Sequence, residues 1–323
     1  FFFKQKTAYE ISTRDWSSDV CSSDLRRPHL LALVLACAAA LMPALRASAA
    51  PIEVRDDAGQ VLRLQAPARR IVSLSPAATE SFFAIGAGAQ VVGTSAYSDY
   101  PAEAKRVPRI ADAYTLNREA VVRLAPDLAI VWGSGTPAQR VAELRALGVP
   151  IFVSEPRSTQ DIASTLERFG VLTGHAPEGR AAAQALRERI AALRARHANA
   201  APVDVFVQIS AVPLMTINAQ HALSEALGLC GARNVFADLP MLAGQIGQEA
   251  VVARNPQLIV AVEPDDAAGA ALAQWQRFGV LRAVRNRQLK SVSPDLLSRA
   301  APSFADGVAA LCKVVEGARQ ATP

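Results

Sequence analysis

The chain has 323 residues, of which 51% are hydrophobic and 20% are charged. At about 100 to 200 residues per domain, this length predicts two domains and excludes a single small module. The apolar content suffices to bury sizeable cores, which excludes intrinsic disorder for most of the chain. The net charge is +5. Because the basic residues are scattered singly, without interleaved aromatic residues, the composition does not indicate a nucleic-acid-binding protein.

The first 49 residues are expected to lie outside the mature fold. Residues 1–25 resemble translated adapter sequence of the kind that contaminates some bacterial assemblies, and we expect them to be non-native. Residues 26–49 are predicted to be a signal peptide, with a basic start, an apolar segment over 30–42 and a small-residue cleavage site before Ala50. Cleavage there places the mature protein in the periplasm.

Two alternatives to a cleaved signal peptide stay open. A transmembrane helix is disfavoured because the apolar segment is shorter than the roughly 20 residues needed to cross a bilayer. Lipidation of Cys37, which follows Val34-Leu35-Ala36, is the second alternative. It is disfavoured because apolar sequence continues beyond Cys37 and the downstream cleavage site competes.

Residues 50–174 alternate predicted strands and helices, which indicates an N-terminal α/β lobe. In chain order we expect a hairpin over 52–64, strands over 71–74, 91–93, 128–131 and 151–153, and helices over 77–85, 118–124 and 138–147. The strands are continuously apolar and the connections are short. This pattern predicts a parallel sheet covered by helices on both faces.

Residues 201–323 repeat the alternation and predict a second α/β lobe, with strands over 203–209, 258–262 and 288–292 and helices over 222–229 and 304–318. Glu119, Pro126 and Leu128 of the first lobe recur 130 positions later as Glu249, Pro256 and Leu258. This recurrence indicates equivalent units in the two lobes. Two independent amphipathic helix-to-strand units are the alternative.

Residues 175–200 join the two lobes and are predicted to form one helix, because Pro177 suits a first helical turn and Ala, Leu, Arg and Glu dominate the rest of the segment. About 20 helical residues span roughly 30 Å. The predicted fold is therefore α/β, with two Rossmann-like lobes containing parallel sheets, held apart and bridged by one long, stiff α-helix. Such lobes should reorient little when a ligand binds.

Only Cys230 and Cys312 belong to the predicted mature chain. An exported protein meets an oxidising compartment, so these residues are predicted to form one disulfide. A cross-link that closes so long a loop stabilises the fold by about 4 kcal/mol on the chain-entropy model. Two buried free thiols are the alternative.

Motifs for catalysis are sparse. The sequence contains no nucleophile elbow, P-loop, dinucleotide fingerprint or zinc-protease motif. Residues 133–135 (GSG) fit either an anion-binding turn or an ordinary tight turn. The histidines of the mature chain lack metal-ligand spacing, so neither a metal site nor a resident cofactor is expected. These features favour a ligand-binding protein over an enzyme. An exported hydrolase using Ser134 and a purely structural partner protein are the alternatives.

Several motifs resemble one known family. They are residues 70–80 (RIVSLSPAATE), 95–101 (SAYSDYP), 117–119, 126–128, 131–132, 230–231 and 249, with Asp295, Arg299, Pro302 and Cys312 further on. Together they are similar to the cobalamin-binding branch of the periplasmic metal-chelate binding proteins with a helical backbone, the class III type. The likeness covers most of residues 69–315. It implies a monomer that binds a metal chelate, cobalamin above all, between its lobes and delivers it to the membrane subunits of an ABC importer.

The resemblance also assigns candidate ligand residues. Tyr97, Tyr114 and Trp132 are expected to offer flat aromatic surfaces to a corrin ring. Asp295 and Arg299 are expected to hydrogen-bond its amide rim. The remaining candidates are Ser75 and Pro76, at the carboxyl end of the first lobe's first strand, where open α/β sheets bind ligands. The alternatives are ordinary core or rim packing for the aromatic residues and a surface ion pair for Asp295 with Arg299.

Two departures from the family pattern bear on the ligand. Family members carry further tryptophans where this chain has Ala113 and Ala243, and Tyr114 is expected to compensate. Haem-binding relatives use a tyrosine ligand where this chain has Asp112, which disfavours haem, although Tyr114 or Tyr97 could serve. A ferric siderophore or haem binder of the same fold is therefore the alternative within the class.

The family resemblance gives one further role, to Glu119 and Glu249. The matching glutamates, one in each lobe, dock onto arginines of the two importer subunits in the resembled proteins. A twofold importer would then meet a pseudo-twofold pair of exposed carboxylates. The local alternative is a favourable interaction of each carboxylate with the dipole of its helix.

Overall fold

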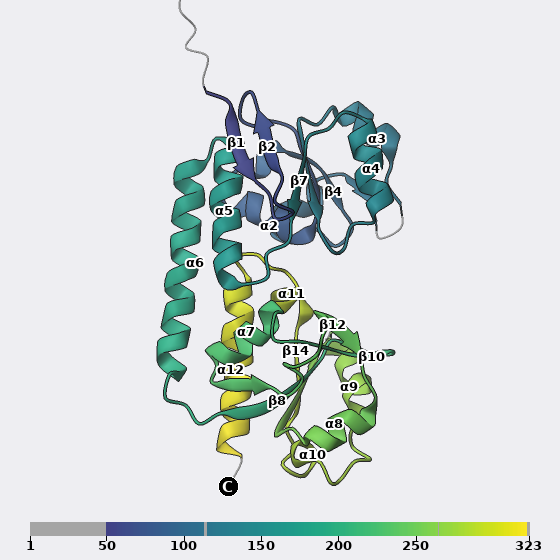
Figure 1. Ribbon diagram of the computed structural model, residues 1–323, viewed down its shortest axis with the longest axis vertical. Helices are drawn as coiled ribbons and strands as arrows, with labels where there is room; N and C mark the ends of the chain where they lie inside the picture. The colour runs from purple at the N-terminus through teal and green to yellow at the C-terminus, as the bar shows by residue number, and fades with distance from the viewer. Residues whose placement is uncertain (1–49, 113–114, 264, 322–323) are drawn as a thin grey trace, which may run out of the picture. The chain divides into compact units, whose positions relative to one another are not determined.

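The computed structural model describes residues 50–112, 115–263 and 265–321. The predicted non-native segment, the signal peptide, the possible lipidation site Cys37 and Tyr114 lie outside the described residues. The described chain forms two α/β lobes with parallel sheets, joined by one long helix (Figure 1). The predicted fold class is confirmed. Across the described ranges, none of the helices combines the length and apolar character that a bilayer span requires.

The N-terminal lobe is a five-stranded parallel sheet with the strand order β5-β4-β3-β6-β7, preceded by an antiparallel hairpin in which Ile52 pairs with Leu64. Its strands are β1 (Ile52–Arg55), β2 (Val61–Leu64), β3 (Ile71–Leu74), β4 (Val91–Ser95), β5 (Arg109–Ala111), β6 (Leu128–Trp132) and β7 (Ile151–Ser154). Its helices are α2 (Pro76–Ala84), η1 (Gly88–Gln90), η2 (Ala102–Arg106), α3 (Arg118–Leu124), α4 (Ala138–Ala146) and α5 (Thr159–Thr173). The central strand β3 is buried throughout, as a strand covered on both faces should be.

Helix α5 was not among the predicted elements. Its boundary signals are nevertheless present in the sequence: the Ser158 side chain accepts a hydrogen bond from Asp161 N, and Gly174 ends the helix with φ of 78°. Phe169 of α5 stacks on Phe82 of α2, with 4.5 Å between ring centroids. Helix α5 therefore belongs to the core of the lobe.

The bridging helix α6 (Ala176–His197) is continuous, as predicted. It does not stand alone, because it packs lengthwise against α5 (Figure 1). Gly179 permits the close approach, since a Cβ there would lie 2.6 Å from the carbonyl oxygen of Leu166. One hydrophobic cluster also runs from Phe82 of the N-terminal lobe through Leu186 of α6 to Val308 of the C-terminal lobe. The expectation that a spacer holds the lobes apart is wrong, because a shared core joins them.

The C-terminal lobe contains a four-stranded parallel sheet with the order β11-β8-β13-β14 and a separate antiparallel sheet with the order β12-β10-β9. Its strands are β8 (Val203–Gln208), β9 (Ser210–Ala211), β10 (Leu214–Ile217), β11 (Ala232–Asn234), β12 (Ala243–Gln245), β13 (Leu258–Val262) and β14 (Leu289–Val292). Its helices are α7 (Ala222–Leu229), α8 (Gln248–Arg254), α9 (Asp265–Ala273), α10 (Arg282–Arg285), α11 (Pro294–Leu297) and α12 (Phe304–Gln320). The antiparallel sheet was not predicted, because strands of two to four residues leave almost no periodicity to detect.

The sequence recurrence at an offset of 130 marks equivalent structures. Helices α3 and α8 each have seven residues and each ends at a residue in the left-handed region, Ala125 and Asn255, both with φ of 41°. A proline follows each of them, and then a five-residue strand, β6 or β13, that is an internal strand of its parallel sheet. Glu119 and Glu249 hold the second position of their helices, so the two lobes repeat this unit with the same lengths and order.

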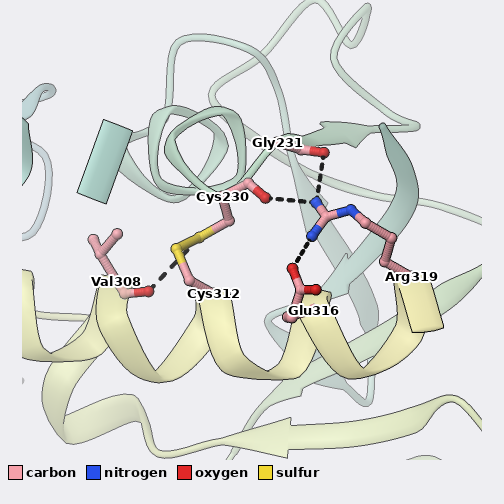
Figure 2. Close-up of a disulfide and its surroundings, with 6 residues drawn as sticks. All are labelled: Cys230, Gly231, Val308, Cys312, Glu316 and Arg319. Carbon is pink, nitrogen blue, oxygen red and sulfur yellow. Dashed lines mark hydrogen bonds and ion pairs between the residues drawn. A yellow bond between two sulfur atoms is a disulfide. The ribbon is translucent and has the colours of Figure 1, made fainter. Parts of the chain in front are cut away.

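A disulfide joins Cys230, at the end of α7, to Cys312 of α12 across 82 residues of sequence (Figure 2). The predicted disulfide is confirmed, and the free-thiol alternative is wrong. Arg319 reinforces this contact. Its guanidinium pairs with Glu316 on the same helix and donates hydrogen bonds to the carbonyl oxygens of Cys230 at 2.9 Å and Gly231 at 3.3 Å. The carbonyl group of Cys230, at the end of α7, thereby gains a donor, and the Gly231 carbonyl group accepts from Val203 N as well.

Candidate ligand-binding site

A cavity with a volume of about 620 Å³ is lined by residues of both lobes. The N-terminal lobe lines it with Ser75, Pro76, Ala77, Tyr97, Asp99, Lys105, Trp132, Ser154, Glu155, Pro156 and Arg157. The C-terminal lobe lines it with Gln220, His221, Ala222, Leu242, Asp295, Leu297, Ser298, Arg299, Ala300 and Phe304. Six of the seven predicted ligand residues are brought together here, and the seventh, Tyr114, lies outside the described residues.

The N-terminal wall presents two aromatic side chains to solvent. Tyr97 is 78% exposed and Trp132 is 48% exposed, and each follows or ends a strand of the parallel sheet. Large aromatic side chains are normally among the most buried in a protein. The two exposed rings therefore give one wall of the cavity an accessible aromatic surface.

The backbone at Tyr97 is held in an unfavourable conformation. Its φ of 63° is uncommon for a bulky residue. Arg109 fixes the loop that carries it, by donating hydrogen bonds to the carbonyl oxygen of Ser98 at 2.8 Å and to Asp99 Oδ1 at 2.6 Å. Sequence reasoning did not single out Arg109, which lies on β5. Its proximity to this loop appears only once β4 and β5 pair.

Trp132 depends on a nearby glycine in the turn after it. A Cβ at Gly135 would lie 1.9 Å from the indole ring, so the ring rests directly on the backbone there. In the same turn, both the backbone N–H and the hydroxyl of Ser134 donate hydrogen bonds to Glu155. The turn interpretation of residues 133–135 fits these contacts. An anion site does not, because a carboxylate of the protein already occupies the donors.

Asp295 and Arg299 are charged residues of the C-terminal wall. They lie 3.6 Å apart from Oδ1 to Nη1 across one turn, so the ion pair considered from the sequence exists together with pocket lining. The Arg299 side chain is only 13% exposed. Its guanidinium lies over the ring of Tyr100 at 5.6 Å, and its Nε lies 3.4 Å from Glu80 Oε2.

Glu80 is a buried carboxylate that sequence reasoning did not assign to the site. Burial raises the pKa of Glu80 above its ordinary value, and nearby Asp306 acts in the same direction. Hydrogen bonds from Ser303 and the charge of Arg299 oppose the shift. Arg299 is thus held between one buried carboxylate and one exposed carboxylate, Asp295, with its position fixed before any ligand arrives.

His221 is a second lining residue that the sequence did not reveal. Its Nδ1 accepts a hydrogen bond from Leu223 N at 3.1 Å and so caps the start of α7. Burial lowers the pKa of His221, although nearby Glu155 opposes the shift. An imidazole that accepts through Nδ1 carries its proton on Nε2, so His221 is a neutral hydrogen-bond donor at neutral pH.

Glu119 and Glu249 do not line the cavity. Both are exposed on the first turns of α3 and α8. Glu119 borders a separate shallow depression formed with Arg118, Val122, Arg123 and Leu147. The Glu249 side chain lies close to Gly247 at the start of its helix. A Cβ at Gly247 would lie only 2.7 Å from Glu249 Oε2. Both carboxylates are accessible to a macromolecular partner.

Within the described ranges, histidine, cysteine, aspartate and glutamate side chains do not gather in groups of three or more that could hold a metal ion. The groups that line the cavity include aromatic rings, two arginines, a lysine, carboxylates and one neutral imidazole. Such a lining can bind and orient a ligand through ring stacking and hydrogen bonds.

A two-lobed α/β fold with a ligand-sized cavity between the lobes defines a solute-binding class of protein. The chain belongs to the periplasmic binding protein family, whose model matches residues 71–296.

Among curated relatives, it is 36% identical to the vitamin B12-binding protein of Vibrio cholerae serotype O1 over 254 residues, which cover 79% of this chain and 91% of that protein. It is 38% identical to the vitamin B12-binding protein of Photorhabdus laumondii over 197 residues, which cover 61% of this chain and 72% of that protein.

The fold is also similar to solved structures. The periplasmic vitamin B12 binding protein BtuF of Vibrio cholerae matches with a TM-score of 0.71 at 36% identity, over 78% of this chain and 98% of that one. A periplasmic haem-binding protein of Pseudomonas aeruginosa matches with a TM-score of 0.67 at 26% identity, over 76% of this chain and 91% of that one.

Proposed function

We propose that this protein is a periplasmic solute-binding protein that captures cobalamin, or a related corrinoid, between its lobes and delivers it to an ABC importer. The observation that carries the proposal is the pair of exposed aromatic side chains, Tyr97 and Trp132, on one wall of the inter-lobe cavity. A corrin is a broad plate with apolar faces and an amide rim, and stacked rings stabilise such faces.

The opposite wall suits the rim of the same molecule. Arg299 and His221 offer N–H donors to amide carbonyl groups, and Asp295 offers an acceptor to amide N–H groups. Cobalamin brings its own axial groups to cobalt, so the protein need not supply a metal ligand. Cobalamin is then the transported ligand and not a resident cofactor. The similarity to vitamin B12-binding proteins supports this choice of ligand.

The proposed role is binding without catalysis, by a monomer. The Ser134 hydroxyl, which the hydrolase alternative would use as a nucleophile, donates to the carboxylate of Glu155 at 3.1 Å. A serine nucleophile is normally activated by a histidine base, which a carboxylate at this position does not replace. Turnover of an ester or amide substrate that Ser134→Ala abolishes would contradict the binding role.

We assign Glu119 and Glu249 to docking on the two membrane subunits of the importer. Their support is structural equivalence, since each holds the second position of a seven-residue helix that leads into an internal strand of its sheet. Two equivalent carboxylates present similar surfaces to two equivalent subunits. The delivered ligand and the docking surfaces then lie on different parts of the molecule.

The periplasmic location depends on a leader that lies outside the described residues. Export with cleavage before Ala50 predicts that protein recovered from the periplasm begins at Ala50, which intact-mass measurement can establish. A mass that includes an acylated Cys37 would show that the protein is a lipoprotein and is not cleaved before Ala50. A disulfide in the described chain fits an oxidising compartment.

Titration of the mature protein with cyanocobalamin tests the proposal directly. We expect one molecule of cyanocobalamin to bind per chain, with a shift in its visible spectrum and quenching of Trp132 fluorescence. Haemin and a ferric hydroxamate serve as competing ligands of the same general class. Binding of either one in place of cyanocobalamin would overturn the assignment.

Haem is the second candidate, and a single observation favours it. The phenol of Tyr97 is exposed in the cavity, and tyrosine is an established axial ligand of haem iron. If haem is the ligand, Tyr97→Phe should abolish the charge-transfer absorbance of the haemin complex. If cobalamin is the ligand, the same variant should retain most of its affinity, because the ring that stacks is kept.

A further inference from the structure

Two glutamates, one from each lobe, accept hydrogen bonds from the opposite lobe. Glu80, on α2 of the N-terminal lobe, accepts hydrogen bonds from Ser303 N at 2.7 Å and Ser303 Oγ at 2.9 Å, at the start of α12 in the C-terminal lobe. Glu225, on α7 of the C-terminal lobe, accepts hydrogen bonds from Thr159 N at 2.7 Å and Thr159 Oγ1 at 2.6 Å, at the start of α5 in the N-terminal lobe. We call these two contacts the crossed clamps.

The crossed clamps use the same chemistry at equivalent places. In each lobe, the helix that follows the first strand of the parallel sheet supplies the carboxylate, and a later helix supplies the hydroxyl residue at its N-terminus. A carboxylate that accepts one backbone and one hydroxyl hydrogen bond fixes both distance and orientation. Two such contacts running in opposite directions oppose both the opening and the rotation of one lobe against the other.

Each clamp also lies about one helical turn from a residue that lines the cavity. Glu80 lies four residues after Pro76, and Glu225 lies four residues after His221, so each pair shares a helix face. Phe304, which lines the cavity, follows Ser303 directly. We therefore expect a change in either clamp to alter the positions of the adjacent lining residues.

Glu80 has an additional partner inside the cavity. Its Oε2, which accepts the Ser303 hydroxyl, lies 3.4 Å from Arg299 Nε. Arg299 Nε is buried and makes no hydrogen bond within the described part of the chain. The position of this arginine, which faces the ligand, therefore depends on the clamp carboxylate beside it.

We infer that Glu80 and Glu225 are positioning residues, and that the crossed clamps hold the lobes at the separation that fits the ligand before the ligand arrives. This inference rests on the proposed function for the identity of the ligand, but not for the clamping itself. A ligand that binds only the clamped arrangement has an apparent Kd that rises in proportion as the clamped fraction falls. The competing explanation is that the shared hydrophobic cluster alone sets the lobe separation.

Double electron–electron resonance distances between the lobes test the inference without any ligand. Spin labels are attached to Gln139→Cys on α4 and Val280→Cys in the C-terminal lobe, both exposed positions. Glu80→Ala, Glu225→Ala and the double variant are compared with the labelled parent. Asp204→Ala is the matched control, because the Asp204 carboxylate pairs with Arg233 and Arg282 entirely inside the C-terminal lobe.

We expect one narrow distance distribution for the parent and the control, a broader one for each single variant, and the broadest for the double variant. If the clamped fraction falls to about one tenth, the Kd for cyanocobalamin rises about tenfold. A double variant with the parent's distance distribution would overturn the inference and assign the lobe separation to the hydrophobic cluster.

Replacement variants and the ligand titration cover the cases in which Glu80→Ala does not fold or cyanocobalamin does not bind. If Glu80→Ala does not fold, Ser303→Ala and Glu80→Gln replace it. Ser303→Ala removes the hydroxyl donor and should broaden the distribution, whereas Glu80→Gln keeps an acceptor for Ser303 N and should broaden it less. If the distances broaden as expected and the parent does not bind cyanocobalamin, the clamps stand and the proposed ligand is wrong.

Discussion

Each lobe fastens an early helix to a later one, but the two lobes use different chemistry. In the N-terminal lobe, Phe82 of α2 stacks on Phe169 of α5. In the C-terminal lobe, Cys230 at the end of α7 is disulfide-bonded to Cys312 of α12. The same helix pairing is therefore maintained by apolar burial in one lobe and by a covalent bond in the other. The two lobes should consequently differ in their response to core truncation and to reduction.

Truncation of the aromatic pair should have the largest effect on stability. Phe82 is fully buried, and Phe82→Ala removes its ring from contact with Phe169 and leaves a cavity. We expect a loss of about 3 to 5 kcal/mol in the free energy of unfolding, measured by denaturant titration. Val171→Ala, at an exposed position of α5, should change it by less than about 0.5 kcal/mol. A comparable loss in both variants would show that the stacked pair has no special role.

Removal of the disulfide should destabilise the C-terminal lobe by a slightly smaller amount. The double variant Cys230→Ser with Cys312→Ser loses a cross-link that closes a loop of 82 residues, which typically costs about 2 to 4 kcal/mol. Fluorescence of Trp275, buried in the C-terminal lobe, reports its unfolding. Reduction of the parent should reproduce the loss. If reduction destabilises the double variant equally, the effect is not due to this bond.

The two lobes also differ in the groups that they contribute to the cavity. The N-terminal wall supplies the exposed rings of Tyr97 and Trp132, and the C-terminal wall supplies polar groups. Trp132→Ala should weaken cyanocobalamin binding by about 1 to 3 kcal/mol through lost apolar burial, measured by calorimetry. Trp132→Phe keeps a ring and should recover most of the affinity. An unchanged affinity in the alanine variant would place the ligand elsewhere.

The contribution of Glu80 to folding stability should decrease as the pH rises. A carboxylate whose pKa is lowered by folding would show the opposite dependence. Burial raises the pKa of Glu80 above 4.5, so folding favours its protonated form. Its contribution to stability is therefore fully present below its unfolded pKa and declines as the pH rises through the raised value. The parent should gain stability relative to Glu80→Gln as the pH falls from neutral toward 4.5. Thermal unfolding of both proteins across this range measures the difference, and a constant offset would contradict the prediction.

The docking glutamates should have the smallest effect on ligand affinity. Glu119 and Glu249 lie outside the cavity, so the double variant Glu119→Ala with Glu249→Ala should bind cyanocobalamin with unchanged affinity. Cobalamin uptake by cells that carry this variant should fall. Each single variant is expected to retain part of the uptake, because one of the two contacts remains. Full uptake by the double variant would exclude these residues from docking.

Much of the fold could be predicted from the sequence, because strongly apolar strands and capped helices are local signals. The strand of residues 71–74, the helix of residues 118–124 and the helix of residues 222–229 agree with the predictions at both ends. Residues 71–74 lie in a parallel sheet, where every side chain is buried, so an unbroken apolar run specifies them. The cavity residues Tyr97 and Trp132 were named because the motifs that contain them resemble a known family, and not from the strand pattern alone.

Local periodicity and composition were enough to specify the two α/β lobes, the helix between them and the pairing of the two mature cysteines. Three other features emerged from packing alone: the lobes share one hydrophobic core, Arg109 holds the Tyr97 loop, and the clamp glutamates Glu80 and Glu225 reach across to the opposite lobe. The physical reason is separation along the chain. A contact between residues that lie 66 or 223 positions apart leaves no pattern in either segment, and it exists only when packing brings the two helices together.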